Sequence, residues 1–143
     1  MKNIQPDFAI TTAEQMSFIG TFLGGISVTI LVTIVVFSSS KKSINWIIAT
    51  SAFAASSFLI SVIASMRLIL ALHPEVYIAT SPEKLFLLWK SMIGAYAVGV
   101  VSLILSIGLS GWLRSHRSGL VTTLIASMAM FFFIYSSVFS GMN

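Results

Sequence analysis

Hydroxyl side chains at regular spacing are the residues of this sequence best suited to chemistry inside an apolar protein. In the first apolar stretch, small and hydroxyl residues recur every four positions as Ser17, Thr21, Gly25, Thr29 and Thr33. Residues four apart are neighbours on the surface of a helix, so these five predict a helical row. Two interpretations remain open: the row packs against another helix in lipid, or it lines a wet path for ions.

Two later apolar stretches carry rows of the same kind. They are Thr50, Ala54, Ser57, Ser61 and Ala64 in the second stretch, and Ser91, Ala95, Gly99, Ser102 and Ser106 in the third. Close packing explains such rows, because small residues let helix backbones approach each other in lipid. The row of the first stretch has four hydroxyls, which makes it the best candidate to line a pore.

Two cations, Arg67 and Lys90, lie closest to the apolar stretches. Counting about 20 residues from the basic-loop end of each helix places both near the opposite membrane interface. In one interpretation each side chain lies along lipid and its charge reaches water. In the other, the two cations of every copy form a positive ring with no competing carboxylate, which favours anions.

Carboxylates are absent from most of the apolar sequence. No aspartate or glutamate occurs at residues 15–74 or 84–143. Proton-coupled transporters and cation channels generally use carboxylates or histidines within the membrane, which disfavours both classes. The two histidines, His73 and His116, lie in predicted loops far apart in sequence, and the chain has no cysteine. We therefore expect no metal, no cofactor and no enzymatic activity.

The elements that must position these residues are long apolar helices. Of the 143 residues, 57% are hydrophobic and only 8% are charged, whereas soluble domains carry about 25% charged residues. Runs of about 20 apolar residues are typical of membrane spans. The sequence therefore predicts an all-α integral membrane four-helix bundle, formed by a single transmembrane domain over residues 1–143. The predicted spans are about 15–37, 44–72, 83–113 and 120–139.

Cap residues predict where the helices begin. The pairs Thr11 with Glu14 and Thr12 with Gln15 both fit a capping box ahead of the first span. Ser81-Pro82-Glu83 places a serine cap, a proline and an acid at the start of the third helix. Four spans of one chain hardly enclose a wide conduit, so a pore requires a homo-oligomer.

The loops after the first and third spans form a basic face. It comprises Lys41, Lys42, Arg114 and Arg117 and includes no acid. By the positive-inside rule we expect these loops to be cytoplasmic and both termini to be external, although counting Arg67 and Lys90 on the opposite side removes the difference in charge. Anionic lipid explains such a face, and in an oligomer the same charges suit an anionic regulatory ligand such as an oligonucleotide. No aromatic-basic stacking motif accompanies them, and we expect no readout of duplex DNA.

The small size, the four spans, the missing enzymatic domain and the acid-free basic face resemble the small membrane channel effectors of bacterial antiphage systems, of the Hailong type. The resemblance covers architecture and charge distribution. It implies a homo-oligomeric anion channel of the bacterial inner membrane, with an antiviral role, held shut by a nucleotide-derived ligand. The alternative is a non-conducting membrane anchor or regulatory subunit of a partner complex.

Overall fold

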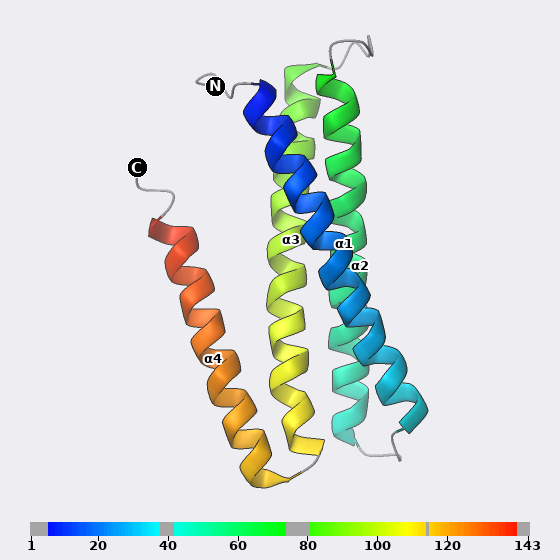
Figure 1. The fold of residues 1–143 in the computed structure, drawn as a ribbon, viewed down its shortest axis with the longest axis vertical. Helices are drawn as coiled ribbons and strands as arrows, with labels where there is room; N and C mark the ends of the chain where they lie inside the picture. The colour runs from blue at the N-terminus through cyan, green and yellow to red at the C-terminus, as the bar shows by residue number, and fades with distance from the viewer. Residues whose placement is uncertain (1–5, 38–41, 74–80, 114, 140–143) are drawn as a thin grey trace. The chain divides into compact units, whose positions relative to one another are not determined.

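The computed structural model describes residues 6–37, 42–73, 81–113 and 115–139, and nearly all of them are helical (Figure 1). The elements are α1 (Pro6–Phe37), α2 (Lys42–Leu72), α3 (Pro82–Ser110), the short 3-10 helix η1 (Gly111–Leu113) and α4 (His116–Phe139). The described residues contain no strand. The all-α fold that the sequence predicts is therefore confirmed.

All four described α-helices are long and apolar enough to cross a membrane. Their apolar segments are Asp7–Val36, Ile44–Leu72, Glu83–Leu113 and His116–Tyr135. An α-helix rises 1.5 Å per residue, and the hydrocarbon core of a bilayer is about 30 Å thick. The first three segments are therefore longer than the hydrocarbon core, and the fourth matches it.

Helix α1 begins earlier than the predicted span, at Pro6 rather than at residue 15. The hydroxyls of Thr11 and Thr12 donate to the carbonyls of Asp7 and Phe8, at 2.9 and 2.8 Å. Both threonines lie inside the helix and bond backward to its own backbone. The predicted capping boxes are therefore wrong, and Glu14 lies within α1 rather than ahead of it.

The predicted start of α3 is confirmed. The carbonyl of Ser81 accepts hydrogen bonds from the amides of Lys84 and Leu85, at 3.0 and 3.2 Å. Pro82 is the first helical residue, where a missing amide proton costs nothing because that amide would have no partner in the helix.

The start of α4 differs from the prediction, because the helix begins at His116 rather than at residue 120. Ser115 caps it: its hydroxyl oxygen accepts from the amide of Ser118 at 3.1 Å, and its carbonyl accepts from the amide of Gly119 at 2.9 Å. Part of the basic segment between α3 and α4 therefore forms the first turn of α4.

The chain divides into two compact units, and α1, α2 and α3 each contribute a segment to both. The first unit comprises Met1–Ile26 and Ala55–Gly99, and the second comprises Ser27–Ala54 and Val100–Asn143. Each unit has its own core.

Phe58 of α2 organises the first unit. Its side chain is fully buried and meets Tyr96 edge to face, with 5.9 Å between ring centroids. A methyl group added at Gly99 would lie 2.9 Å from the Phe58 ring, and one added at Gly24 would lie 3.4 Å from its Cβ. Glycine at both positions thus lets α1 and α3 pack closely on Phe58.

Isoleucines and paired serines form the core of the second unit. Ile34, Ile44 and Ile47 are buried together, and the hydroxyls of Ser51 and Ser106 bond each other at 2.5 Å between α2 and α3. These contacts join three helical segments through apolar packing and one polar pair.

Helix α4 is fixed to α3 near the turn between them. The hydroxyl of Thr122 donates to the carbonyl of Gly108 at 3.1 Å, and a methyl group at Gly108 would lie 3.1 Å from Ala126. Elsewhere α4 is little covered, since only 6% of its most apolar stretch is buried, against 39% for α2.

Candidate functional site

The hydroxyl row of α1 lies mainly on an outer surface. Ser17 is half-buried, whereas Thr21, Gly25, Thr29 and Thr33 are exposed. The hydroxyl of Thr21 donates to the carbonyl of Ser17 at 2.8 Å, and that of Thr33 donates to the carbonyl of Thr29 at 2.7 Å. The two hydroxyl protons are thus held by the helix, while the oxygens still have lone pairs to accept further bonds.

The rows of α2 and α3 lie largely inside the chain instead. Ser57, Ser61, Ser102 and Ser106 are buried. The hydroxyl of Ser61 donates to the carbonyl of Met92 at 3.0 Å across the α2–α3 contact. Packing between helices accounts for these two rows, which leaves the row of α1 as the one without such an explanation.

The row of α1 does not run straight along its helix. At 3.6 residues per turn, each step of four residues rotates by about 40°, so Ser17 and Thr33 point about 160° apart on a straight helix. Rows of this spacing are inclined by about 26° to the helix axis. On a straight helix, neighbouring members of the row can therefore face one axis, whereas its two ends face different sides.

Two aromatic residues follow the row in the first unit, and the sequence analysis missed them. Phe18 and Phe22 are 78% and 65% exposed. A shallow groove of about 510 Å³ runs beside them, and it is lined by Glu14, Ser17, Phe18, Thr21, Phe22, Met66 and Ile69. Spacing gives no signal for them, because Ile30 and Ile34, which follow Thr29 and Thr33 in the same way, are half-buried and buried.

Arg67 and Lys90 are both exposed in the first unit. The ammonium of Lys90 lies over the ring of Phe86, 4.4 Å from its centroid. Phe86 is one turn nearer the start of α3, so the charge reaches toward the helix end, as the snorkelling interpretation predicts. The cation–π contact also gives the ammonium a partner while its other side stays accessible.

Glu14, Arg67 and Lys90 lie toward the same end of the first unit. Ala13 of α1, Leu68 of α2 and Met92 of α3 belong to one buried cluster, and the three charged residues are one or two positions away from them. All three therefore lie within about one helical turn of that cluster. The predicted cationic ring is not free of acid, because an exposed carboxylate accompanies the two cations at this end of the unit.

The basic face of the sequence is described only in part. Arg117 is exposed in the first turn of α4. Lys41, Arg114 and the side chain of Lys42 lie outside the described residues. Beside Arg117, the ring of His116 meets Trp112 edge to face at 5.0 Å.

Trp112 of η1, which follows the end of α3, contacts α4. Its indole Nε1 donates to the hydroxyl of Thr123 at 3.0 Å. A methyl group at Gly119 would lie 2.6 Å from the indole, so glycine is required for the contact. The tryptophan thus anchors α4, in addition to the interfacial position that its residue type predicts.

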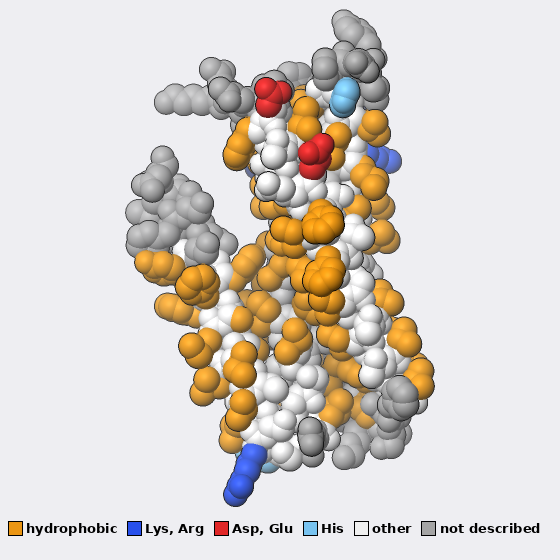
Figure 2. All heavy atoms as spheres, viewed as in Figure 1, with side chains coloured by type: hydrophobic (Ala, Val, Ile, Leu, Met, Phe, Trp, Pro, Cys, Tyr) orange, Lys and Arg blue, Asp and Glu red, His pale blue; other side chains and the backbone are white. Residues whose placement is uncertain are grey.

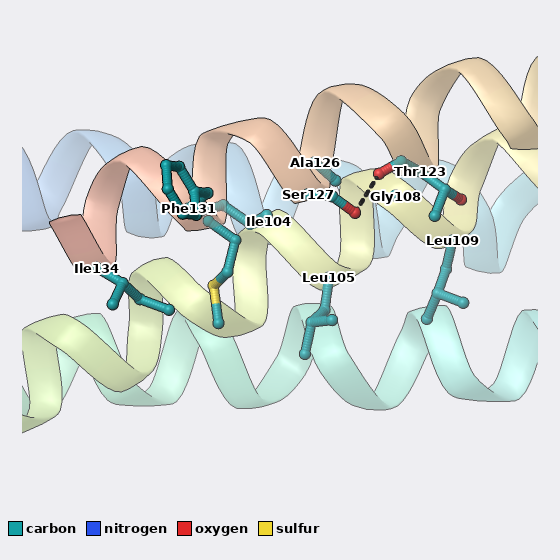
Figure 3. Close-up of a pocket in the computed structure, with 10 residues that line it drawn as sticks. Ile104, Leu105, Gly108, Leu109, Thr123, Ala126, Ser127, Phe131 and Ile134 are labelled. Carbon is teal, nitrogen blue, oxygen red and sulfur yellow. Dashed lines mark hydrogen bonds between the residues drawn. The ribbon is translucent and has the colours of Figure 1, made fainter.

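A second groove, of about 410 Å³, lies between α3 and α4 in the second unit (Figure 3). Its lining is mostly aliphatic and aromatic, including Ile104, Leu105, Phe131 and Ile134. The hydroxyl of Ser127 points back to the carbonyl of Thr123, at 2.8 Å. The groove therefore presents apolar surface and no reactive group.

Across the described ranges, no group of three histidine, cysteine, aspartate or glutamate residues could hold a metal ion. Apolar side chains cover much of the visible surface of both units, as in lipid-facing proteins (Figure 2). No family model matches the chain, and no curated protein or solved structure matches it significantly.

Proposed function

We propose that copies of this chain assemble into a membrane channel that conducts ions and prefers anions. The observation that supports this proposal is the different burial of the hydroxyl rows. The rows of α2 and α3 are used inside the chain, whereas Thr21, Thr29 and Thr33 of α1 are exposed. A row of hydroxyls on the outside of an apolar helix suits either water or a neighbouring helix, and a channel axis provides both.

The charges support a preference for anions. Among the described residues near the buried cluster of Ala13, Leu68 and Met92, the two cations Arg67 and Lys90 outnumber the one carboxylate, that of Glu14. Symmetry multiplies that excess around an axis and concentrates anions near the mouth. Arg117 and the other cations of the basic face would add to the field in the same sense.

We extend the proposal to regulation at the basic face. Arg117, together with Lys41, Lys42 and Arg114, would bind anionic lipid or an anionic ligand. In a bacterial inner membrane, loss of that ligand would open the channel, as the resemblance to antiphage effectors implies. Controlled expression without the ligand should then depolarise cells, as measured with a potential-sensitive dye.

Reversal potentials of purified protein in planar bilayers test the conduction. With asymmetric potassium chloride, the reversal potential should lie near the equilibrium potential of chloride. Thr21→Val and Thr33→Val remove hydroxyls at nearly constant volume and should lower the single-channel conductance. Ser127→Ala is the matched control, because its exposed hydroxyl is bonded within α4 in the same way. Cation preference, or silence in every lipid composition, would contradict the proposal.

A second candidate function is a non-conducting membrane subunit that holds a partner protein. The bonds of Thr21 and Thr33 to their own helix favour it, because hydroxyls satisfied in this way tolerate a dry contact. Such a protein would carry no current, and the same two valine substitutions would weaken its association with the partner instead.

A further inference from the structure

We propose that neighbouring copies join through a seam between two outer helix faces of the first unit. The α1 face carries Glu14, Phe18 and Phe22, and it packs on the α3 face of the next copy, which carries Lys90, Gly94 and Val98. The seam rests on the homo-oligomer of the proposed function and specifies how that oligomer is held together.

The two faces are complementary at the same helical spacing. Each consists of three exposed residues four apart, which places them on one row of their helix. Along the seam, the acid Glu14 meets the cation Lys90. The ring of Phe18 then meets Gly94, and the ring of Phe22 meets Val98.

The structure places the partners of each pair within about one helical turn of the same level. Ala13 of α1 and Met92 of α3 share one buried cluster, and Glu14 and Lys90 are one and two residues away from them. Phe18 and Phe22 follow Glu14 at the spacing at which Gly94 and Val98 follow Lys90. A rotation about an axis parallel to the helices keeps levels unchanged, so it brings each residue within about one turn of its partner on the next copy.

Gly94 offers a site into which the ring of Phe18 can pack. A methyl group added at Gly94 would meet no atom within 4 Å, and the side chain of Phe18 is 78% exposed. The chain uses the same combination internally, where the ring of Phe58 packs on Gly99. Glycine in an exposed helix interior is less favourable than alanine, and a contact between copies accounts for its presence there.

Charge complementarity fixes which faces meet. The ammonium of Lys90 lies on the outer side of α3 over Phe86, and Glu14 is exposed beside the α1–α2 groove. Charged groups near a membrane interior are costly unless they are paired, so each group stabilises the other across the seam. Two different faces meet, and such an interface closes into a ring when the rotation allows it.

Cysteine cross-linking tests the seam with no background, because the chain has no cysteine. Copies carrying Phe18→Cys and copies carrying Gly94→Cys, with different tags, are mixed in lipid and oxidised. We expect a disulfide between the two tags, since it can form only between copies. The matched control replaces Gly94→Cys by Ile60→Cys, which is exposed at a similar level on α2 and should not cross-link.

Charge reversal gives a second readout. Glu14→Lys alone and Lys90→Glu alone each place like charges across the seam and should weaken oligomer formation at least about tenfold. The double variant Glu14→Lys/Lys90→Glu should restore it. Lys84→Glu, at an exposed position near the start of α3, is the control and should leave assembly unchanged.

Three outcomes overturn the seam. An oligomer of normal mass without the Phe18–Gly94 disulfide refutes it and leaves the channel proposal standing. A disulfide between two Phe18→Cys copies in place of the mixed product indicates a two-fold α1 contact instead. A protein that is monomeric in lipid before any substitution overturns the channel proposal as well.

Discussion

Glycines on α1 and α3 serve two purposes. The space around each glycine shows which of the two it serves. Gly99 is buried against the ring of Phe58, and a methyl group added there would lie only 2.9 Å from ring atoms. Gly25 and Gly94 are exposed, and a methyl group added there would meet nothing within 4 Å. The first glycine therefore supports the fold of one chain, whereas the other two leave room for something outside it.

Gly99→Ala should destabilise the first unit by about 1–3 kcal/mol, because overpacking a dense core forces side chains or backbone to shift. Thermal unfolding in detergent should show a lower transition temperature. Gly25→Ala is the matched control: it adds the same methyl group in open space and should leave the transition unchanged or raise it slightly, because alanine favours the helix. Equal effects of the two substitutions would contradict the assigned role of Phe58.

Helix α4 depends on a few contacts near its start. Trp112 donates to Thr123, and Gly119 lies directly beneath the indole. The rest of the helix is mostly uncovered, with Phe131 and Phe132 more than 70% exposed. Its position on α3 therefore depends on the turn between the two helices more than on contacts along its length.

Gly119→Ala should loosen the α3–α4 hairpin, because the added methyl group would lie 2.6 Å from the indole of Trp112. Amide hydrogen exchange should accelerate in α4 and remain unchanged in the first unit. Gly25→Ala is the control, since it adds the same group to α1 in open space. Uniform acceleration in both units would show global unfolding and argue against a local anchor.

The helices could be predicted from the sequence, but their first residues only in part. Ser81 followed by Pro82 marks the start of α3 correctly, because each residue type suits one position only. Thr11 and Thr12 are ambiguous, because a threonine hydroxyl also bonds the carbonyl four residues earlier inside a helix. The helix beginning at Pro6 therefore includes Glu14, and the carboxylate lies toward the same end of the first unit as Lys90.

At the scale of the whole molecule, composition predicts that the protein belongs to the membrane class. Spacing alone does not predict whether a hydroxyl row is buried inside the chain or exposed. The row of Thr21 recurs every four residues and the row of Ser61 every three or four, which are both helical spacings, yet Thr21 is exposed and Ser61 is buried. The difference depends on which helices are neighbours, and in lipid a small residue suits either position. Phe18 escaped notice for the same reason.

The protein in lipid nanodiscs should have a mass several times that of one chain, because the proposed path requires an axis between copies. Mass photometry measures it directly. Lys90→Glu should shift the population toward the monomer, and Lys84→Glu should not. A single-chain mass for the unaltered protein would leave no axis for conduction.

An even number of membrane-length helices has a practical consequence for genetic fusion. If α1 to α4 each cross once, the outer ends of α1 and α4 emerge on the same side of the bilayer. A hydrophilic tether can then connect α4 of one protomer to α1 of the next without an added crossing. Tandem genes of defined repeat number would thus fix the stoichiometry and let one altered repeat be compared with many.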